Sequence, residues 1–100
     1  MRLYRVVSPA ELADIRACGY LRPAPPSNQS KWFAERLQDA RIWARNLYTL
    51  WSQPFHIIEV EVADPVADSW HQSPFQDQIG PARFAPETDL LLITIVGETS

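Results

Sequence analysis

An arginine inside the first predicted strand places the strongest constraint on how this chain can fold. Side chains alternate along a strand, so Arg5 shares one face with Leu3 and Val7. If that face packs into the core, the guanidinium must meet an anion, because an unpaired buried charge is costly. The anion is either a carboxylate of the protein, with Glu59 and Glu61 as candidates, or the phosphate of a ligand.

Length and composition indicate a single globular domain spanning residues 1–100. Hydrophobic residues make up 46% of the chain and charged residues 21%, which argues against disorder. The formal net charge is −3 and the sequence contains no basic run, so capture of nucleic acid by charge is not expected to be the main activity.

The cysteine and apolar patterns indicate a reducing compartment. Cys18 is the only cysteine, and with two distant histidines it offers neither a disulfide nor the spacing of a metal site. No apolar segment approaches the length of a membrane helix, and the first residues do not read as a signal peptide. We therefore expect no membrane partner and a cytoplasmic protein, in the producing cell or in a target cell.

The first helix has clear start and stop signals. Ser8 and Glu11 are spaced as a capping box, in which the serine hydroxyl accepts from the Glu11 amide and the carboxylate reaches back. Pro9 suits the first helical position, and Gly19 provides a left-handed stop after Cys18.

The rest of the chain predicts a small α+β domain with two helices and a mixed, mainly antiparallel sheet. An irregular loop is expected over residues 22–29, a short strand over 31–34, a helix over 36–51 and a strand over 55–62. Residues 63–78 read as irregular, 79–84 as a turn leading into a strand, and 90–96 as a central strand that is apolar on both faces.

Several side chains are candidates for a site, each with a structural alternative. Trp32 and Phe33 form a ring pair that is usually core and less often a wall for a ligand ring. Asp77 directly precedes a turn that can aim it into a cleft, although a solvated turn aspartate is more common. His56 is expected to be a strand residue without a catalytic role, and the loop over 23–30 is either a connection or a lid.

Three blocks of the sequence resemble small ADP-ribosyltransferase-like toxin domains of bacterial polymorphic toxin systems. The first block runs from Leu3 to Glu11 and is followed by Gly19, the second is Lys31-Trp32-Phe33-Ala34 followed by Asp39-Ala40, and the third is Asp77-Gln78-Ile79-Gly80-Pro81-Ala82-Arg83-Phe84. Together these blocks span most of the chain.

This resemblance implies a split sheet that clasps NAD, as substrate, between its two halves. It would place Arg5 on the first strand against an NAD phosphate or ribose, with Tyr4 and Ser30 also at the cofactor site. Trp32 and Phe33 would lie near the nicotinamide. The resemblance implies cleavage of the nicotinamide–ribose bond, with a carboxylate stabilising the positive charge that develops on the ribose.

The acid and the second block depart from the pattern of the resemblance. Many such domains carry a Ser-Thr-Ser motif where this chain has Lys-Trp-Phe-Ala, and a glutamate where it has Gln76-Asp77-Gln78. Asp77 is the carboxylate inside the third block, so the resemblance assigns it, with Arg5, to catalysis. The expected activity is ADP-ribosyl transfer to an intracellular target, or NAD hydrolysis.

Two other readings remain beside the enzyme. The domain could be a non-catalytic interaction module on the same fold, either an antitoxin or immunity-like protein or an adaptor, given its negative charge and many aromatic residues. It could also be a structural domain in which Arg5 is paired internally. If the domain is a toxin, a cognate antitoxin or immunity protein is an expected partner.

Overall fold

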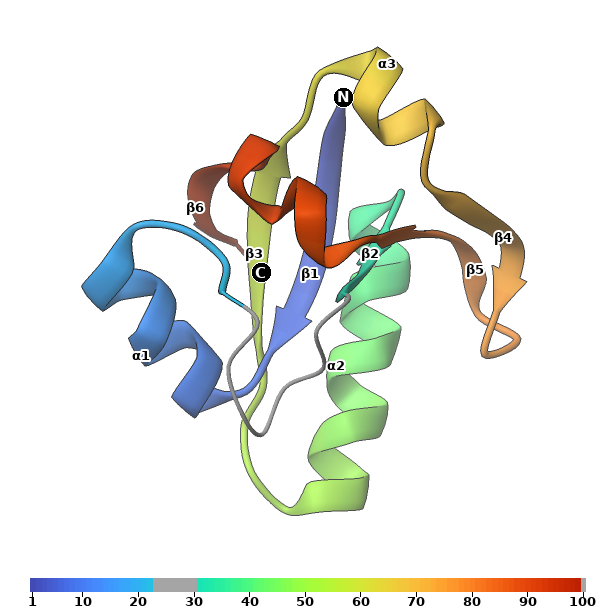
Figure 1. Ribbon diagram of the computed structural model, residues 1–100. Coiled ribbons are helices and arrows are strands. Elements are labelled where there is room, and N and C mark those ends of the chain that lie inside the picture. Colours follow the sequence, from blue (N-terminus) through green and yellow to red (C-terminus); the bar gives the residue numbers. More distant parts are fainter. Residues whose placement is uncertain (23–30, 100) are drawn as a thin grey trace.

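The computed structural model describes residues 1–22 and 31–99, which form a sheet with helices on both faces (Figure 1). In chain order the elements are β1 (Arg2–Val7), α1 (Pro9–Cys18), β2 (Lys31–Ala34), α2 (Leu37–Trp51), β3 (His56–Glu61), α3 (Asp64–Asp68), β4 (His71–Gln76), β5 (Gly80–Ala85), the 3-10 helix η1 (Glu87–Leu92) and β6 (Thr94–Thr99). The predicted loop and possible lid over 23–30 lies outside the described residues.

The described strands form one antiparallel sheet in the order β4-β5-β2-β1-β3-β6. β1 pairs with β3 along its whole length. By contrast, the register of β1 with β2 among the described residues consists of Tyr4 opposite Ala34. The sheet therefore has two three-stranded halves, β4-β5-β2 and β1-β3-β6, that meet at a narrow junction.

Alternation along β1 divides the side chains between two cores. Leu3 and Val7 lie in the larger core, together with residues of α1, α3 and η1. Tyr4 and Val6 pack against a smaller cluster on the opposite face, where Ala40 and its neighbours on α2 cover the sheet. The larger core consists of Leu3, Val7, Leu12, Ile15, Leu21, Phe33, Ile58, Val60, Val62, Ala67, Trp70, Ala85, Leu90 and Ile93.

The α+β class and most of the predicted elements are confirmed. Ser8 Oγ accepts from the Glu11 amide at 3.2 Å, and Gly19 ends α1 with a φ of 82°. The strand predicted over 55–62 and the helix predicted over 36–51 form with their ends shifted by one residue or none. The turn and strand expected over 79–84 become the end of the β4–β5 hairpin and β5.

The structure differs from several of the expectations about the fold. Residues 63–78 are not irregular, because they contain α3 and β4. The central strand expected over 90–96 is instead the end of η1 followed by β6, which lies at an edge of the sheet. With α3 and η1 the described chain has four helices where two were predicted, and all its described strand pairs are antiparallel where a mixed, mainly antiparallel sheet was predicted.

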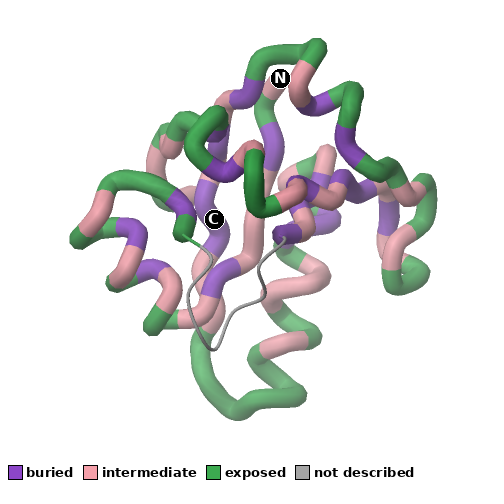
Figure 2. The backbone as a smooth tube through the Cα atoms, viewed as in Figure 1, coloured by how far each residue is buried: buried purple, intermediate pink, exposed green. Residues whose placement is uncertain are grey.

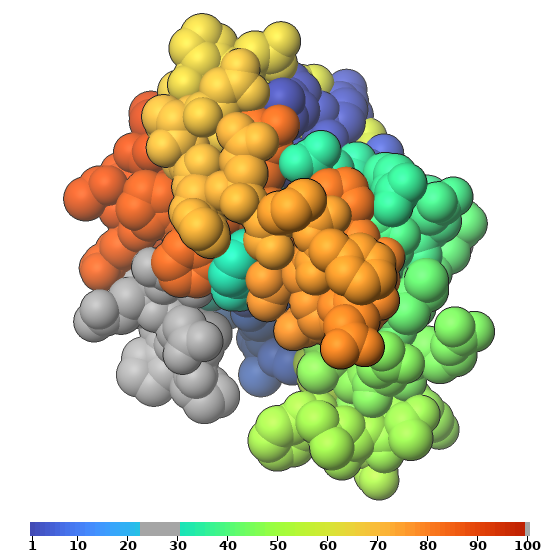
Figure 3. Space-filling view, turned by 90° about the vertical axis from the view of Figure 1, so that its right-hand side faces the viewer, coloured from blue at the N-terminus to red at the C-terminus, as the bar shows by residue number. Residues whose placement is uncertain are grey.

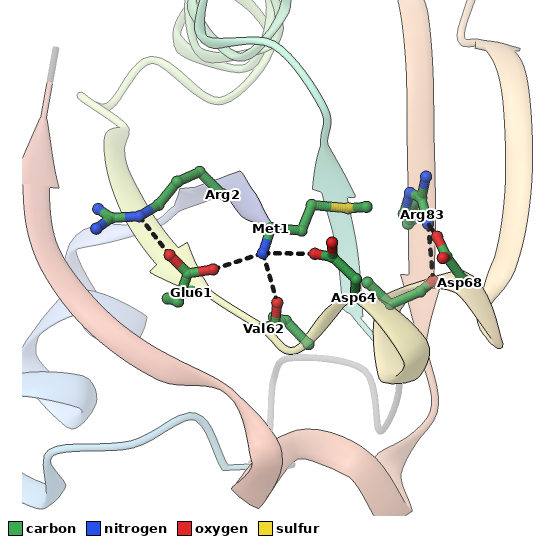
Figure 4. A network of polar contacts seen from close by, with 8 residues as sticks. Met1, Arg2, Glu61, Val62, Asp64, Asp68 and Arg83 are labelled. Atoms are coloured by element: carbon green, nitrogen blue, oxygen red, sulfur yellow. Dashed lines mark hydrogen bonds and ion pairs between the residues drawn. The ribbon is translucent and has the colours of Figure 1, made fainter.

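Polar contacts connect the first residue to the end of β3 and to the residues just after it (Figure 4). The Met1 amino group lies 2.5 Å from Glu61 Oε2, 2.7 Å from the Val62 carbonyl oxygen and 2.9 Å from Asp64 Oδ1. These contacts hold the start of β1 against the end of β3.

Burial is uneven along α2 (Figure 2). The first turns of the helix contain buried Asp39 and Ala40, whereas Tyr48, Leu50 and Trp51 in its last turns are 57%, 72% and 62% exposed. The start of α2 is therefore the part that packs on the sheet, and its end projects from it. Within residues 1–22 and 31–99, no helix is long and apolar enough to cross a membrane.

Candidate functional site

A cavity of about 170 Å³ lies where the two halves of the sheet meet, between α2 and the β4–β5 hairpin. Figure 3 shows the hairpin and α2 lying beside one another on this side of the molecule. The cavity is lined by Tyr4, Arg5, Val6, Trp32, Phe33, Ala34, Trp43, Leu47, Gln76, Asp77 and Ala82. Its walls thus come from β1, β2, α2, β5 and the turn between β4 and β5.

Aromatic rings form much of the wall. Trp32 on β2 contacts Phe84 of the paired strand β5, with ring centroids 4.7 Å apart, and His71 of β4 at 6.1 Å in an edge-on arrangement. Tyr4 and Trp43 belong to the apolar cluster between the sheet and α2. Because each ring is packed against a neighbouring element, the cavity is preformed by the fold.

Asp77 lies at the tip of the β4–β5 hairpin, where the backbone is strained. Asp77 and Gln78 have φ values of 53° and 60°, in the left-handed region that L residues other than Asn, Asp and Gly rarely adopt. The Ile79 amide donates to the Gln76 carbonyl at 2.9 Å, which closes a two-residue turn of the type I′ pattern. This turn brings Asp77 to the cavity wall, which is the less common of the two placements that the sequence allowed.

The Asp77 carboxylate accepts hydrogen bonds from two other residues of the cavity. Trp43 Nε1 donates to Oδ2 at 3.0 Å, and Gln76 Nε2 donates to Oδ1 at 3.3 Å. The first of these bonds joins α2 to the hairpin across the cavity. The carboxylate is thus held from two sides.

The guanidinium of Arg5 lies on the other face of the sheet. Its Nε and Nη2 donate to Glu11 of α1 at 2.7 and 3.0 Å, and its Nη1 donates to the Trp32 carbonyl at 3.1 Å. The guanidinium carbon also lies 5.9 Å from the centre of the Phe33 ring. Since side chains alternate, Arg5 and Phe33 face away from α2, and we infer that they border the cavity through their backbone.

The partner of Arg5 is a protein carboxylate, but the predicted Glu59 and Glu61 are the wrong ones. Both of those residues lie on the opposite face of β3 from the larger core and bind Arg2. In a capping box the Glu11 carboxylate would bond back to the Ser8 backbone. Here it accepts hydrogen bonds from Arg5 instead. The reason is geometric: the first turn of α1 lies directly over the face of β1 that carries Arg5.

Lys31 adds a second cation to this pair. Its side chain is fully buried, and its Nζ lies 3.5 Å from Glu11 Oε2. Burial, together with the nearby charge of Arg5, holds the pKa of Lys31 below its usual value, although Glu11 opposes this. Burial raises the pKa of Glu11, but the hydrogen bond from Arg5 and the charges of Arg5 and Lys31 outweigh it, so the pKa of Glu11 is lowered.

The predicted site residues therefore separate into three groups. Tyr4, Trp32 and Asp77 meet at the cavity on the α2 face. Arg5 belongs to the charged cluster on the α1 face, and Phe33 is buried in the larger core beside Trp70. Ser30 lies outside the described residues.

Sequence reasoning missed Trp43, Leu47 and Gln76 as cavity residues. Trp43 and Leu47 are part of the apolar stripe of α2, and such a stripe indicates core packing. Gln76 was seen as a neighbour of Asp77 in a polar segment. The closeness of Gln76 to Asp77 in the sequence could have indicated that Gln76 belongs to the same site. Nothing in the spacing of apolar residues along α2 indicated that the ring of Trp43 would reach the hairpin.

Three aromatic side chains and one carboxylate around a small cavity suit a flat organic cation. The faces of Trp and Tyr rings attract a cation, and the Asp77 carboxylate adds a negative charge at the wall. An engineered cavity of about 150 Å³ holds a benzene molecule, so the volume fits one aromatic ring. Comparisons of the chain with family models, curated proteins and solved structures found no match.

Proposed function

We propose that this protein is an ADP-ribosyltransferase-like enzyme that cleaves NAD and holds the nicotinamide ring in the cavity at the sheet junction. One observation carries the proposal: Tyr4, Trp32 and Asp77 come from the three separate sequence blocks of the resemblance, and all three line one cavity. The short pairing of β1 with β2 inside the single six-stranded sheet, with the cavity beside it, supports the split sheet that the resemblance implies.

The chemistry of the cavity supports nicotinamide as the bound group. The nicotinamide of oxidised NAD is a planar pyridinium cation, and Tyr4, Trp32 and Trp43, which line the cavity, have aromatic rings of the kind that attract such a cation. The cavity admits one ring and not a whole dinucleotide, so the ribose, pyrophosphate and adenosine would lie outside it.

The proposed reaction breaks the bond between the nicotinamide nitrogen and C1′ of the ribose. The bonding electron pair leaves with the nicotinamide, whose ring becomes neutral, and positive charge develops on the ribose. The Asp77 carboxylate, at the cavity wall, stabilises this charge. A nucleophile then attacks C1′ and loses its proton, which completes transfer to an acceptor or, with water, hydrolysis.

Arg5 takes a different role in this proposal from the one the resemblance implied. Its guanidinium donates to Glu11 and to the Trp32 carbonyl, so it connects α1, β1 and β2 beside the cavity. In this proposal Arg5 positions Trp32. It does not bind the pyrophosphate of NAD, because its guanidinium already donates to Glu11 and to the Trp32 carbonyl. Through the resemblance, the proposal also includes a toxin role, in which the enzyme acts on an intracellular macromolecule. A cognate antitoxin or immunity protein would neutralise it.

The proposal is tested by incubating the purified protein with NAD and measuring released nicotinamide. We expect release by the wild type and its loss in Asp77→Asn by a factor of about 100 or more. Glu87→Gln removes a carboxylate that lies outside the cavity and serves as the matched control. Absence of nicotinamide release by the wild type, with water and with cell-extract acceptors, would refute the enzyme.

The exposed end of α2 favours a second candidate, a non-catalytic interaction module. Tyr48, Leu50 and Trp51 expose large apolar surfaces in its last turns, and such residues are typical anchors for a protein partner. This candidate predicts a melting temperature that does not change with NAD, together with stable capture of a protein that Trp51→Ala abolishes.

A further inference from the structure

The carboxylate of Asp77 depends on another element for its orientation. It belongs to an exposed turn at the far end of a hairpin whose outer strand, β4, is an edge of the sheet. An aspartate on such a turn is free to rotate toward water unless something holds it. Here the indole N–H of Trp43 donates to one carboxylate oxygen at 3.0 Å.

Trp43 is well anchored for this purpose. It lies on α2 and packs with the apolar cluster that includes Tyr4 and Ala34 at the sheet junction. The ring therefore does not move independently of the sheet, and a hydrogen bond to a charged oxygen is stronger than one between neutral groups. The same side chain thus lines the cavity and holds the group that faces it.

A close approach of the Gly80 backbone to Asp39 fixes the turn end of the hairpin against the same helix. A methyl group at Gly80 would lie 2.2 Å from Asp39 Oδ2, so the first turn of α2 and the start of β5 are in direct contact. The distance between α2 and the hairpin is therefore set by packing at Gly80. The Trp43 bond then selects the orientation of the carboxylate within that fixed frame.

We propose that Trp43 is a positioning residue, which fixes the Asp77 carboxylate toward the ribose of NAD while its ring contacts the nicotinamide. This inference rests on the proposed function and deepens it, because it assigns the orientation of the reacting carboxylate to a side chain of α2. Without the indole N–H, the ring contact remains and the carboxylate keeps only the longer hydrogen bond from Gln76 Nε2, at 3.3 Å, within its own hairpin.

The test compares Trp43→Phe with the wild type in steady-state NAD cleavage. Phenylalanine keeps an aromatic wall and removes the N–H donor. We expect kcat to fall about tenfold to a hundredfold, since misplacement of a reacting group is costly, while KM changes less than threefold. Trp51→Phe changes an exposed tryptophan of the same helix and should leave both constants unaltered.

A second readout reports the bond itself. In NMR spectra, the indole N–H resonance of Trp43 should shift between the wild type and Asp77→Asn, and stay in place in Glu87→Gln. Three outcomes would each overturn the positioning role while leaving NAD cleavage intact. The first is a Trp43→Phe variant with unchanged kcat, and the second is a variant whose kcat/KM falls only because KM rises. The third is an indole resonance of Trp43 that does not respond to Asp77→Asn. A wild type that does not cleave NAD would overturn both proposals.

Discussion

Arg5 shows how one buried charge determines the arrangement around it. Its side chain is 14% exposed and that of Glu11 is 13%, so both charges have left most of their water. The pair is compensated by two hydrogen bonds and by the further bond to the Trp32 carbonyl. Removing one member leaves the other charge without its main partner, which costs more than the pair itself contributes.

We predict that Glu11→Gln lowers the free energy of unfolding by roughly 3–5 kcal/mol, because it removes the carboxylate that the largely buried cations Arg5 and Lys31 share. Arg5→Ala should cost less, about 2–3 kcal/mol, since Lys31 still faces the Glu11 carboxylate. Urea denaturation measures both values. Arg16→Ala, which breaks an exposed pair with Glu98, is the control and should change stability by less than about 1 kcal/mol. A larger loss for Arg5→Ala than for Glu11→Gln would contradict this description.

The same carboxylate gives the protein a pH dependence of stability. The pKa of Glu11 is lower in the folded protein than its usual value of 4.5, so the folded state binds fewer protons there than the unfolded chain. The stabilisation is fully present above about pH 4.5 and is lost as the pH falls through the folded-state pKa. We expect the stability difference between the wild type and Glu11→Gln to be constant above about pH 4.5 and to narrow as the pH falls below it in denaturation experiments. A difference that stays constant below about pH 4.5 as well would show that Glu11 is not the titrating group.

At the scale of elements, the β4–β5 hairpin combines backbone strain with close packing. Gln78 adopts a left-handed φ of 60°, whereas Gly80, two residues later, has no room for a side chain beside Asp39. The two positions should therefore respond to substitution in opposite directions.

Gln78→Gly should raise the free energy of unfolding by about 0.5–1 kcal/mol, because glycine adopts the left-handed conformation without strain. The gain is smaller than the full strain energy, because glycine makes the unfolded chain more flexible and so loses more entropy on folding. Gly80→Ala should lower it by roughly 1–3 kcal/mol through overpacking against Asp39. Thermal and urea denaturation of both variants check the pair. A destabilising Gln78→Gly or a neutral Gly80→Ala would show that the turn is arranged differently.

The elements that could be predicted are those with strong local signals. α1 has a serine cap, a proline start and a glycine stop, and α2 has a long apolar stripe. α3 has only five residues, too few for a periodic pattern. β4 is polar and contains Pro74, which an edge strand tolerates. Because of this composition, the sequence pattern did not predict a strand there. The apolar run over 90–96 does not distinguish a buried strand from a helical turn, and the turn formed.

The candidate site was predictable in part for a related reason. Local sequence placed Tyr4 and Trp32 on strands and Asp77 at a turn, which is enough to define their faces. The partner of Arg5 and the reach of Trp43 to the hairpin depend on how α1 and α2 cross the sheet. Those crossings are set by tertiary packing, on which a single sequence carries no direct information.

At the scale of the whole molecule, the cavity joins parts of the chain that are distant in sequence. β1, β2, α2 and the hairpin each contribute to its wall, and the two sheet halves meet beside it. A ligand there contacts both halves at once, so its binding energy adds to the stability of the folded state.

Melting curves should therefore distinguish cofactor forms. We expect oxidised NAD, at tenfold or more above its dissociation constant, to raise the melting temperature by several degrees. Reduced NAD, whose nicotinamide is uncharged, should raise it less, because the attraction of a cation to the aromatic walls is missing. ADP-ribose, which lacks the ring, should also fall below oxidised NAD. Equal shifts from all three compounds would place the binding energy outside the cavity.

The positions of the four tryptophans allow ligand binding to be followed by intrinsic tryptophan fluorescence. Trp32 and Trp43 border the cavity, whereas Trp70 is buried elsewhere and Trp51 stands in solvent. A pyridinium ring placed between the first two would quench their emission and leave the other two bright. Cofactor occupancy would then be visible in the unlabelled protein, with Trp51→Phe removing the largest solvent-exposed background.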